Sequence, residues 1–235
     1  MSFVEPQPKL AVFVHGAGGG GWEWFQWLPS FQKAGWHCLA QDLEPTAEGI
    51  SATRFDDYLR QVVGWTNSFH SINVVLIGAS MGGLLAMKAA ESVQPTALIL
   101  INSVPPAGIS WKPNPAGWPD IIEWSTGSFE ETTVAMPDSE ASVIALAHQS
   151  WRDESGAVLR DMAAGIPVKR PNCPCLVMIG KADTDIEAGI GREIVSSFGA
   201  ESKSYEGFSH LGPLLGIRAS ELIEDALHWI ESKVQ

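Results

Sequence analysis

The sequence predicts an α/β fold, a mainly parallel six-stranded sheet with helices on both faces and an inserted cap. Two patterns predict it. Short, unbroken apolar runs bounded by turn residues recur along the chain, and segments with apolar residues three and four positions apart lie between them. Unbroken apolar runs are typical of parallel strands buried on both faces. Their alternation with amphipathic helices favours a sheet covered on both sides.

Six runs are candidates for the strands of this sheet. Five are apolar enough to be buried, and a sixth is polar enough to lie at an edge. They are residues 10–14, 38–43, 74–77, 97–101 and 175–179, with 202–205 as the edge candidate. Apolar residues at helical spacing predict helices over 55–69 and 219–230.

One interval, residues 104–171, breaks the alternation. It shows no strand pattern, is rich in proline and holds four of the ten tryptophans. A structureless loop of this length is improbable in a compact domain, and short helices are expected at 141–151 and 157–164. We therefore expect a core formed by 1–103 and 172–235, with 104–171 as the inserted cap.

Composition and charge exclude several classes of protein. The 235 residues are 45% hydrophobic and 18% charged, which is typical of a globular chain. The formal charge of −12 argues against binding to nucleic acid. Every apolar run is far shorter than the roughly 18 residues of a membrane span. Residues 1–9 lack the features of a signal peptide, and the three cysteines fit a reducing compartment, so we expect a cytoplasmic location.

The strongest chemical signal is the segment Gly78-Ala79-Ser80-Met81-Gly82, which ends an apolar run and precedes helix-forming residues. A Gly-x-Ser-x-Gly sequence in this context is typical of a nucleophile elbow, in which small residues let the strand and the helix approach closely. The sharp turn lifts the serine toward solvent, so Ser80 is the predicted nucleophile. The alternative is a glycine-rich turn with an incidental serine.

A second motif, His15-Gly16-Ala17 followed by four glycines, ends the first apolar run. It fits a loop that donates a backbone N–H to an oxyanion, and Ala17 and Met81 are the predicted donors. Phosphate binding is the weaker alternative because no Gly-x-Gly-x-x-Gly precedes a helix with a suitably placed acid. His15 is expected to be a structural residue of this loop.

A serine nucleophile needs a base, and six histidines compete for that role. His210 is the predicted base, because it lies between the last strand candidate and the last helix, in a loop that can reach the serine. Three histidines fit surface or packing roles, namely His37, His70 and His228. His148 lies in the expected cap and is a candidate for substrate contact.

The base in turn needs an acid that holds its tautomer. Asp183 follows an apolar run, which places it at the same sheet edge as Ser80, and Asp185 and Glu187 are the fallbacks. The chain order serine, aspartate, histidine is the one expected after this elbow. Asn102, at the end of the preceding strand, supplies no carboxylate.

Over nearly its whole length the chain resembles the α/β-hydrolase superfamily. It is similar to the branch that holds plant methylesterases, hydroxynitrile lyases and bacterial carboxylesterase-like proteins. The resemblance rests on His15-Gly16-Ala17 and on residues 78–83, 180–183 and 207–210. It implies a triad of Ser80, Asp183 and His210, oxyanion donors at Ala17 and Met81, and no metal or cofactor.

These residues predict a serine hydrolase that cleaves a small carboxylic ester through an acyl-enzyme. The expected partner is a small-molecule ester, and the oligomeric state is open. Lyases of the family carry a threonine and a lysine where this chain has Gly16 and Leu211, which disfavours the lyase. The remaining alternatives are lyase-like or cofactor-free C–C cleavage, dioxygenation, and a receptor-like binder without turnover.

Aromatic and apolar residues near the strand ends indicate an apolar pocket for the substrate. The candidates are Trp22, Trp111, Trp124, His148, Phe208 and Leu211. Ordinary packing of the cap against the core is the alternative for each of them.

Overall fold

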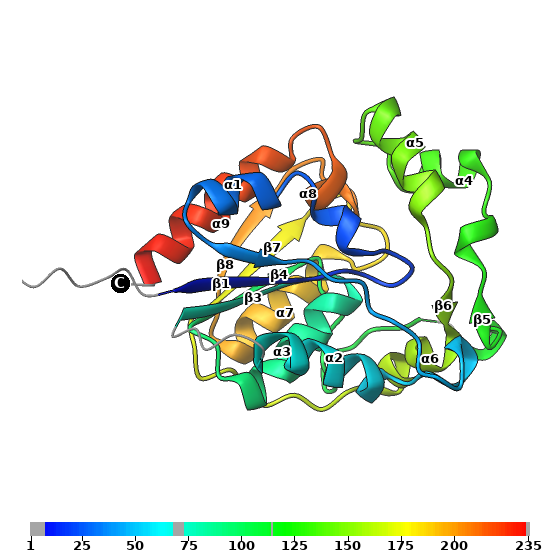
Figure 1. Ribbon diagram of the computed structural model, residues 1–235, viewed down its shortest axis with the longest axis horizontal. Coiled ribbons are helices and arrows are strands. Elements are labelled where there is room, and N and C mark those ends of the chain that lie inside the picture. The colour runs from blue at the N-terminus through cyan, green and yellow to red at the C-terminus, as the bar shows by residue number, and fades with distance from the viewer. Residues whose placement is uncertain (1–7, 68–72, 114, 234–235) are drawn as a thin grey trace, which may run out of the picture.

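The computed structural model describes residues 8–67, 73–113 and 115–233, and it shows a parallel sheet between two layers of helices (Figure 1). The sheet has six strands in the order β2-β1-β3-β4-β7-β8, and every pair is parallel. The strands are β1 (Lys9–Val14), β2 (His37–Leu39), β3 (Asn73–Ala79), β4 (Ala97–Ile101), β7 (Cys175–Gly180) and β8 (Glu201–Tyr205). The predicted fold class is confirmed.

The apolar runs are unbroken because both faces of the sheet are covered. In β1, Leu10, Val12 and Val14 join the hydrophobic cluster on one face, and Ala11 and Phe13 join the cluster on the other. The first cluster packs against α2 (Phe55–Asn67), α3 (Met81–Val93) and α7 (Ala188–Phe198), and the second against α1 (Leu28–Lys33) and α9 (Ala219–Lys233) (Figure 1). The predicted first and last long helices are present. Residues 68 and 69 of the first, and His70, lie outside the described residues.

The second strand is shorter than predicted, because β2 ends at Leu39 and not at residue 43. The following residues turn toward the loop after β1. The carboxylate of Asp42 accepts the backbone N–H of Gly21 at 2.7 Å, and the N–H of Leu43 donates to His15 at 2.9 Å. These hydrogen bonds take the place of further pairing with β1.

The segment between β4 and β7, two neighbours in the sheet, holds two short strands and three α-helices in its described residues. They are β5 (Ile121–Ile122), α4 (Phe129–Ala135), α5 (Ala141–Ser150), β6 (Glu154–Ser155) and α6 (Gly156–Ala164), and β5 and β6 form an antiparallel pair. The two predicted helices correspond to α5 and α6. Helix α4 and the short β pair were not predicted from the sequence. In Figure 1 this segment stands beside the carboxyl ends of the strands, and α6 lies next to α2.

Two further elements lie near these strand ends, the 3-10 turn η1 (Gly21–Trp24) and the short helix α8 (Gly212–Leu215). The carboxyl edge of the sheet is therefore surrounded by the loop after β1, the inserted segment and the loop before α8. Over the described residues, no helix combines the length and the apolar character that crossing a membrane requires.

Candidate active site

Ser80 stands at a strained turn between β3 and α3. Its φ of 53° lies in a region that residues other than glycine rarely adopt, and such strain is concentrated at functional sites. The turn depends on its flanking glycines. A Cβ atom at Gly78 would lie 2.2 Å from the carbonyl oxygen of Gly82, and one at Gly82 would lie 2.1 Å from that of Val14. The close approach of strand, turn and helix therefore requires glycine at both positions.

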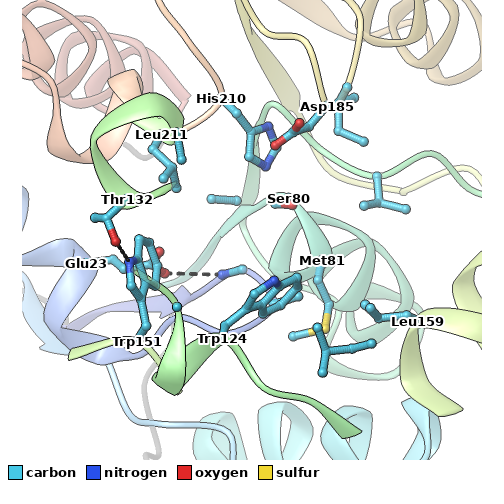
Figure 2. A pocket seen from close by; sticks show the side chains of 18 of the residues that line it. Glu23, Ser80, Met81, Trp124, Thr132, Trp151, Leu159, Asp185, His210 and Leu211 are labelled. Atoms are coloured by element: carbon cyan, nitrogen blue, oxygen red, sulfur yellow. Dashed lines mark hydrogen bonds between the residues drawn. The ribbon is translucent and has the colours of Figure 1, made fainter. Parts of the chain in front are cut away.

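Ser80 lines a cavity of about 670 Å³ at the carboxyl edge of the sheet. The wall is formed by the loop after β1, the β3–α3 turn, the inserted segment and the loop that carries His210 (Figure 2). Ala17, Met81 and His210 line the same cavity as Ser80. Parts of the chain that are far apart in sequence thus meet around the serine.

His210 and Asp183 form a hydrogen-bonded pair. The Nδ1 atom of His210 lies 2.8 Å from Oδ2 of Asp183, whose side chain is fully buried. The other oxygen of Asp183 accepts the backbone N–H groups of Asp185 and Ile186 at 2.8 and 2.9 Å, which fixes the carboxylate. Because Nδ1 faces the carboxylate, Nε2 is the ring nitrogen left to exchange a proton in the cavity.

The electrostatic surroundings of His210 favour its charged form. Burial lowers the pKa of the imidazole, but the hydrogen bond and charge of Asp183, with smaller contributions from Asp185 and Glu23, outweigh it and raise the pKa above the ordinary value. An imidazolium formed during a reaction would be stabilised by the same groups.

Two side chains outside the cavity wall hold the loop that carries His210. Asn102 accepts the N–H of Gly180 at 2.7 Å and donates to the carbonyl oxygens of Ser209 and His210 at 3.2 and 3.0 Å. Asp138, in the inserted segment, accepts the N–H and the hydroxyl of Ser209 at 3.0 and 2.6 Å. From the sequence, Asn102 was expected only to supply no carboxylate, and no role was predicted for Asp138.

The loop after β1 faces the serine directly. A Cβ atom at Gly16 would lie 3.3 Å from Cβ of Ser80, and Ala17 next to it is partly exposed to the cavity. Met81 is the first residue of α3, so its N–H has no acceptor within the helix. These two N–H groups are the ones that the sequence motifs assign to an oxyanion site.

His15 is held inside this loop by both ring nitrogens. Nδ1 donates to the carbonyl oxygen of Gly16 at 2.7 Å, and Nε2 accepts the N–H of Leu43 at 2.9 Å. Burial lowers its pKa to about 4, so the ring is neutral at ordinary pH. This agrees with the structural role expected for His15.

Glu23 is a buried acid in the cavity wall that the sequence analysis missed. Only 2% of its surface is exposed, and its carboxyl group accepts the N–H of Gly16 at 3.4 Å (Figure 2). It occupies space left by a glycine, because a Cβ atom at Gly19 would lie 2.2 Å from its Oε2. Burial raises its pKa to about 8. The one feature of the sequence that could have indicated a buried acid here is its position between two tryptophans, Trp22 and Trp24.

The predicted substrate contacts divide into two groups. Trp111, Trp124 and Leu211 line the cavity. The other three, Trp22, His148 and Phe208, are absent from its described lining. Trp22 packs edge-on against Trp151, with ring centres 5.3 Å apart.

Packing also accounts for the positions of Phe208 and His148. Phe208 is 2% exposed and contacts Tyr205, with 5.6 Å between ring centres, so it belongs to the core under β8. His148 packs edge-on against the ring of Phe129, with 5.4 Å between ring centres, and its Nδ1 lies 3.5 Å from the hydroxyl of Thr132, which itself lines the cavity. Trp118 and Trp151, the other two tryptophans of the inserted segment, also line the cavity.

Comparison with known proteins gives one family and several relatives. A family described as the alpha/beta hydrolase family matches residues 11–215. Methylesterase 2 of Arabidopsis thaliana is 28% identical over 209 residues, which are 80% of this chain and 75% of that protein. The probable esterase PIR7A of rice, Oryza sativa subsp. indica, is 31% identical over 115 residues, which are 45% of this chain. That match spans only 43% of the rice protein.

Among solved structures, methylketone synthase I from tomato, complexed with 2-tridecanone, shares the fold. The TM-score is 0.76 at 16% sequence identity, and the match covers 96% of this chain and 99% of that chain. The likeness therefore extends over the sheet, the helices and the inserted segment.

Proposed function

The chain belongs to the alpha/beta hydrolase family, and from this premise we propose that it hydrolyses small carboxylic esters with Ser80 as nucleophile. One observation carries the proposal. Ser80, at its strained turn, shares a single cavity with His210, whose Nδ1 lies 2.8 Å from the buried carboxylate of Asp183. The similarity to proteins named methylesterase and probable esterase supports an ester as the substrate.

The proposed reaction has two halves. His210 takes the proton of Ser80 through Nε2 while the serine oxygen attacks the ester carbonyl, and the N–H groups of Ala17 and Met81 donate to the oxyanion. The intermediate collapses, His210 gives the proton to the departing alcohol, and an acyl-serine remains. Water then attacks the acyl-enzyme with His210 as base, which releases the carboxylic acid and restores the serine. Asp183 orients the ring and stabilises the imidazolium.

Two positions support hydrolysis over cyanohydrin cleavage. A lyase needs a positive group to hold the departing cyanide, and the chain has Leu211 next to the proposed base and Gly16 next to His15. Hydrolysis needs no such group. In the same proposal residues 104–171 act as the cap on a core of 1–103 and 172–235, since four tryptophans of that segment line the cavity that holds Ser80.

The test is hydrolysis of p-nitrophenyl acetate, butyrate and octanoate by the wild type and by Ser80→Ala. We expect turnover by the wild type and a loss of about a thousandfold or more in the variant. The matched control is Ser220→Ala on an exposed position of α9, which should keep the wild-type rate. Equal rates for Ser80→Ala and the wild type would contradict the proposal.

Covalent labelling separates an enzyme from a binding protein of the same fold. A fluorophosphonate should add to Ser80 in the wild type, and mass spectrometry of the peptide should locate the adduct there. Absence of both labelling and turnover would favour the receptor-like alternative.

A further inference from the structure

The cavity around Ser80 has an aromatic wall. Four of the described residues that line it are tryptophans, all from the inserted segment, namely Trp111, Trp118, Trp124 and Trp151. An indole face is the side-chain surface that best attracts a cation, because its π electrons carry partial negative charge.

Two of these rings are held in place beside the serine. Trp124 covers the loop after β1, where a Cβ atom at Gly18 would lie 2.1 Å from a carbon of the indole ring. Trp151 donates its Nε1–H to the hydroxyl of Thr132 at 3.2 Å and packs edge-on against Trp22. Figure 2 shows Trp124 and Trp151 together on the side of the cavity that faces Ser80. Rings fixed in this way are already arranged for a ligand.

The charged side chains of the cavity are all acidic. Its described lining holds four carboxyl groups, from Glu23, Glu123, Glu131 and Asp185, and neither lysine nor arginine. Three of them are exposed toward solvent, and the buried one is Glu23. A negative charge entering this cavity would meet no cation except a protonated His210.

Two arginines that are chain neighbours of cavity-lining residues pair with acids elsewhere. Arg152 pairs with Asp42 and Glu44 at 3.4 and 3.0 Å, and Arg160 pairs with Asp120 at 3.0 Å. Neither lines the cavity in the described structure. The acidic groups at the cavity therefore keep their effect on an incoming molecule.

We propose that this cavity selects esters that carry an ammonium group and rejects esters that carry a second, free carboxylate. The inference rests on the proposed ester hydrolysis and names its substrate class. The indole faces bind the ammonium group, and the exposed carboxylates attract it into the cavity. The same carboxylates repel the acid formed by hydrolysis, which favours its release.

The size of the effect follows from known interactions. One cation–π contact changes affinity by about two- to thirtyfold, depending on how far the cation is desolvated. The contribution of exposed carboxylates is small and falls with salt. We therefore expect a preference of about tenfold or more at low ionic strength, part of which survives at high salt.

The experiment compares kcat/KM for matched esters that differ only in charge. Acetylcholine is paired with 3,3-dimethylbutyl acetate, and ethyl 4-(trimethylammonio)butanoate with ethyl 5,5-dimethylhexanoate, so the cation lies in the alcohol or in the acyl part. The monoethyl ester of glutaric acid supplies the anion. The cationic ester of at least one pair should be favoured about tenfold, and the anionic ester should react at least tenfold more slowly than the neutral ones. Equal kcat/KM within both pairs would overturn the inference.

Variants locate the preference. Trp124→Leu should lower the ratio of cationic to neutral kcat/KM at every salt concentration, and Asp185→Asn should lower it mainly at low salt. Glu224→Gln removes the same charge from an exposed position of α9, away from the cavity, and should leave the ratio unchanged. If Glu224→Gln lowered this ratio as much as Asp185→Asn does, the net charge of the protein alone would explain the preference, and the proposed cation site would be refuted.

A binding measurement separates this inference from the proposed function. Choline and its neutral isostere 3,3-dimethylbutan-1-ol are titrated into Ser80→Ala and followed by saturation-transfer NMR. Tighter binding of choline, without turnover of any ester by the wild type, would support the cation site while the hydrolase proposal fails. Turnover of neutral esters with no preference for choline would sustain hydrolysis and refute the cation site.

Discussion

The side-chain oxygen of Asn102 accepts the backbone N–H of Gly180 at 2.7 Å, across the ends of β4 and β7. The amide nitrogen of the same side chain donates to the carbonyl oxygens of Ser209 and His210. One buried residue thus ties the strand that leads to Asp183 to the loop that carries His210. Asparagine also suits the backbone there, because Asn102 has a φ of 42° and tolerates the left-handed region better than most residues.

Asn102→Ala should therefore lower both stability and activity. The variant leaves the buried N–H of Gly180 without its acceptor and removes two donated hydrogen bonds, for which we expect a loss of roughly 2 to 4 kcal/mol in urea unfolding. Ester hydrolysis should fall at least about tenfold, since His210 is no longer held. Asn67→Ala, at an exposed position near the end of α2, is the matched control. Unchanged unfolding of Asn102→Ala would contradict the role assigned to these hydrogen bonds.

The fall of esterase activity at low pH should report the protonation of His210. A base acts only when neutral, and the neighbouring carboxylates raise the pKa of this imidazole above its ordinary 6.5. We expect kcat/KM for p-nitrophenyl acetate to fall as the pH drops through a midpoint above 6.5. Asp185→Asn removes one of the raising charges and should shift the midpoint to lower pH. A midpoint below 6.5 in the wild type, or a shift upward in the variant, would contradict this assignment.

The strands could be predicted because burial on both faces leaves a strong pattern. β1, β3, β4 and β7 appear in the sequence as unbroken apolar runs. The antiparallel pair β5 and β6 has two residues in each strand, too few for any periodicity. The seven residues of α4 are also short, although Ser128 and Glu131 form a capping box that the sequence already contains.

The candidate site could be predicted in part for a similar reason. Ser80, Asp183 and His210 follow recognisable local motifs, and their catalytic roles stay predictions. The burial of Glu23 depends on how the glycine loop wraps around it, which no spacing encodes. Whether a tryptophan lines the cavity depends on the path that the inserted segment takes over the core. The sequence therefore could not show that Trp151 lines the cavity and that Trp22 packs behind it.

A pair of glycine substitutions tests the packing of the elbow. A Cβ atom at Gly82 would lie 2.1 Å from the backbone oxygen of Val14, so Gly82→Ala should destabilise the protein by at least about 2 kcal/mol. Gly64 lies inside α2, and no atom of the described residues comes within 4 Å of the added Cβ, so Gly64→Ala should stabilise by up to about 1 kcal/mol. Urea unfolding of both variants checks the opposite signs. An unchanged or higher stability of Gly82→Ala would contradict the close strand–helix contact.

The buried carboxyl group of Glu23 should make stability depend on pH. Burial raises its pKa to about 8, against about 4.5 for an unperturbed glutamate. Between these values the folded protein holds a proton that the unfolded chain has released, so the free energy of unfolding falls as the pH rises through this window. Glutamine does not titrate, and Glu23→Gln removes this contribution. The variant should therefore gain stability relative to the wild type between pH 5 and pH 8.5.

The measurement is the urea midpoint of both proteins across that range. His210 and Asp42 face the same carboxyl group and are present in both proteins, so the difference between the two curves isolates Glu23 to a first approximation. Glu224→Gln, an exposed carboxylate on α9, should run parallel to the wild type. If Glu23→Gln also ran parallel, Glu23 would be ionised in the folded protein at neutral pH. The cavity would then hold a fourth negative charge beside Ser80, which would strengthen its expected preference for cationic esters.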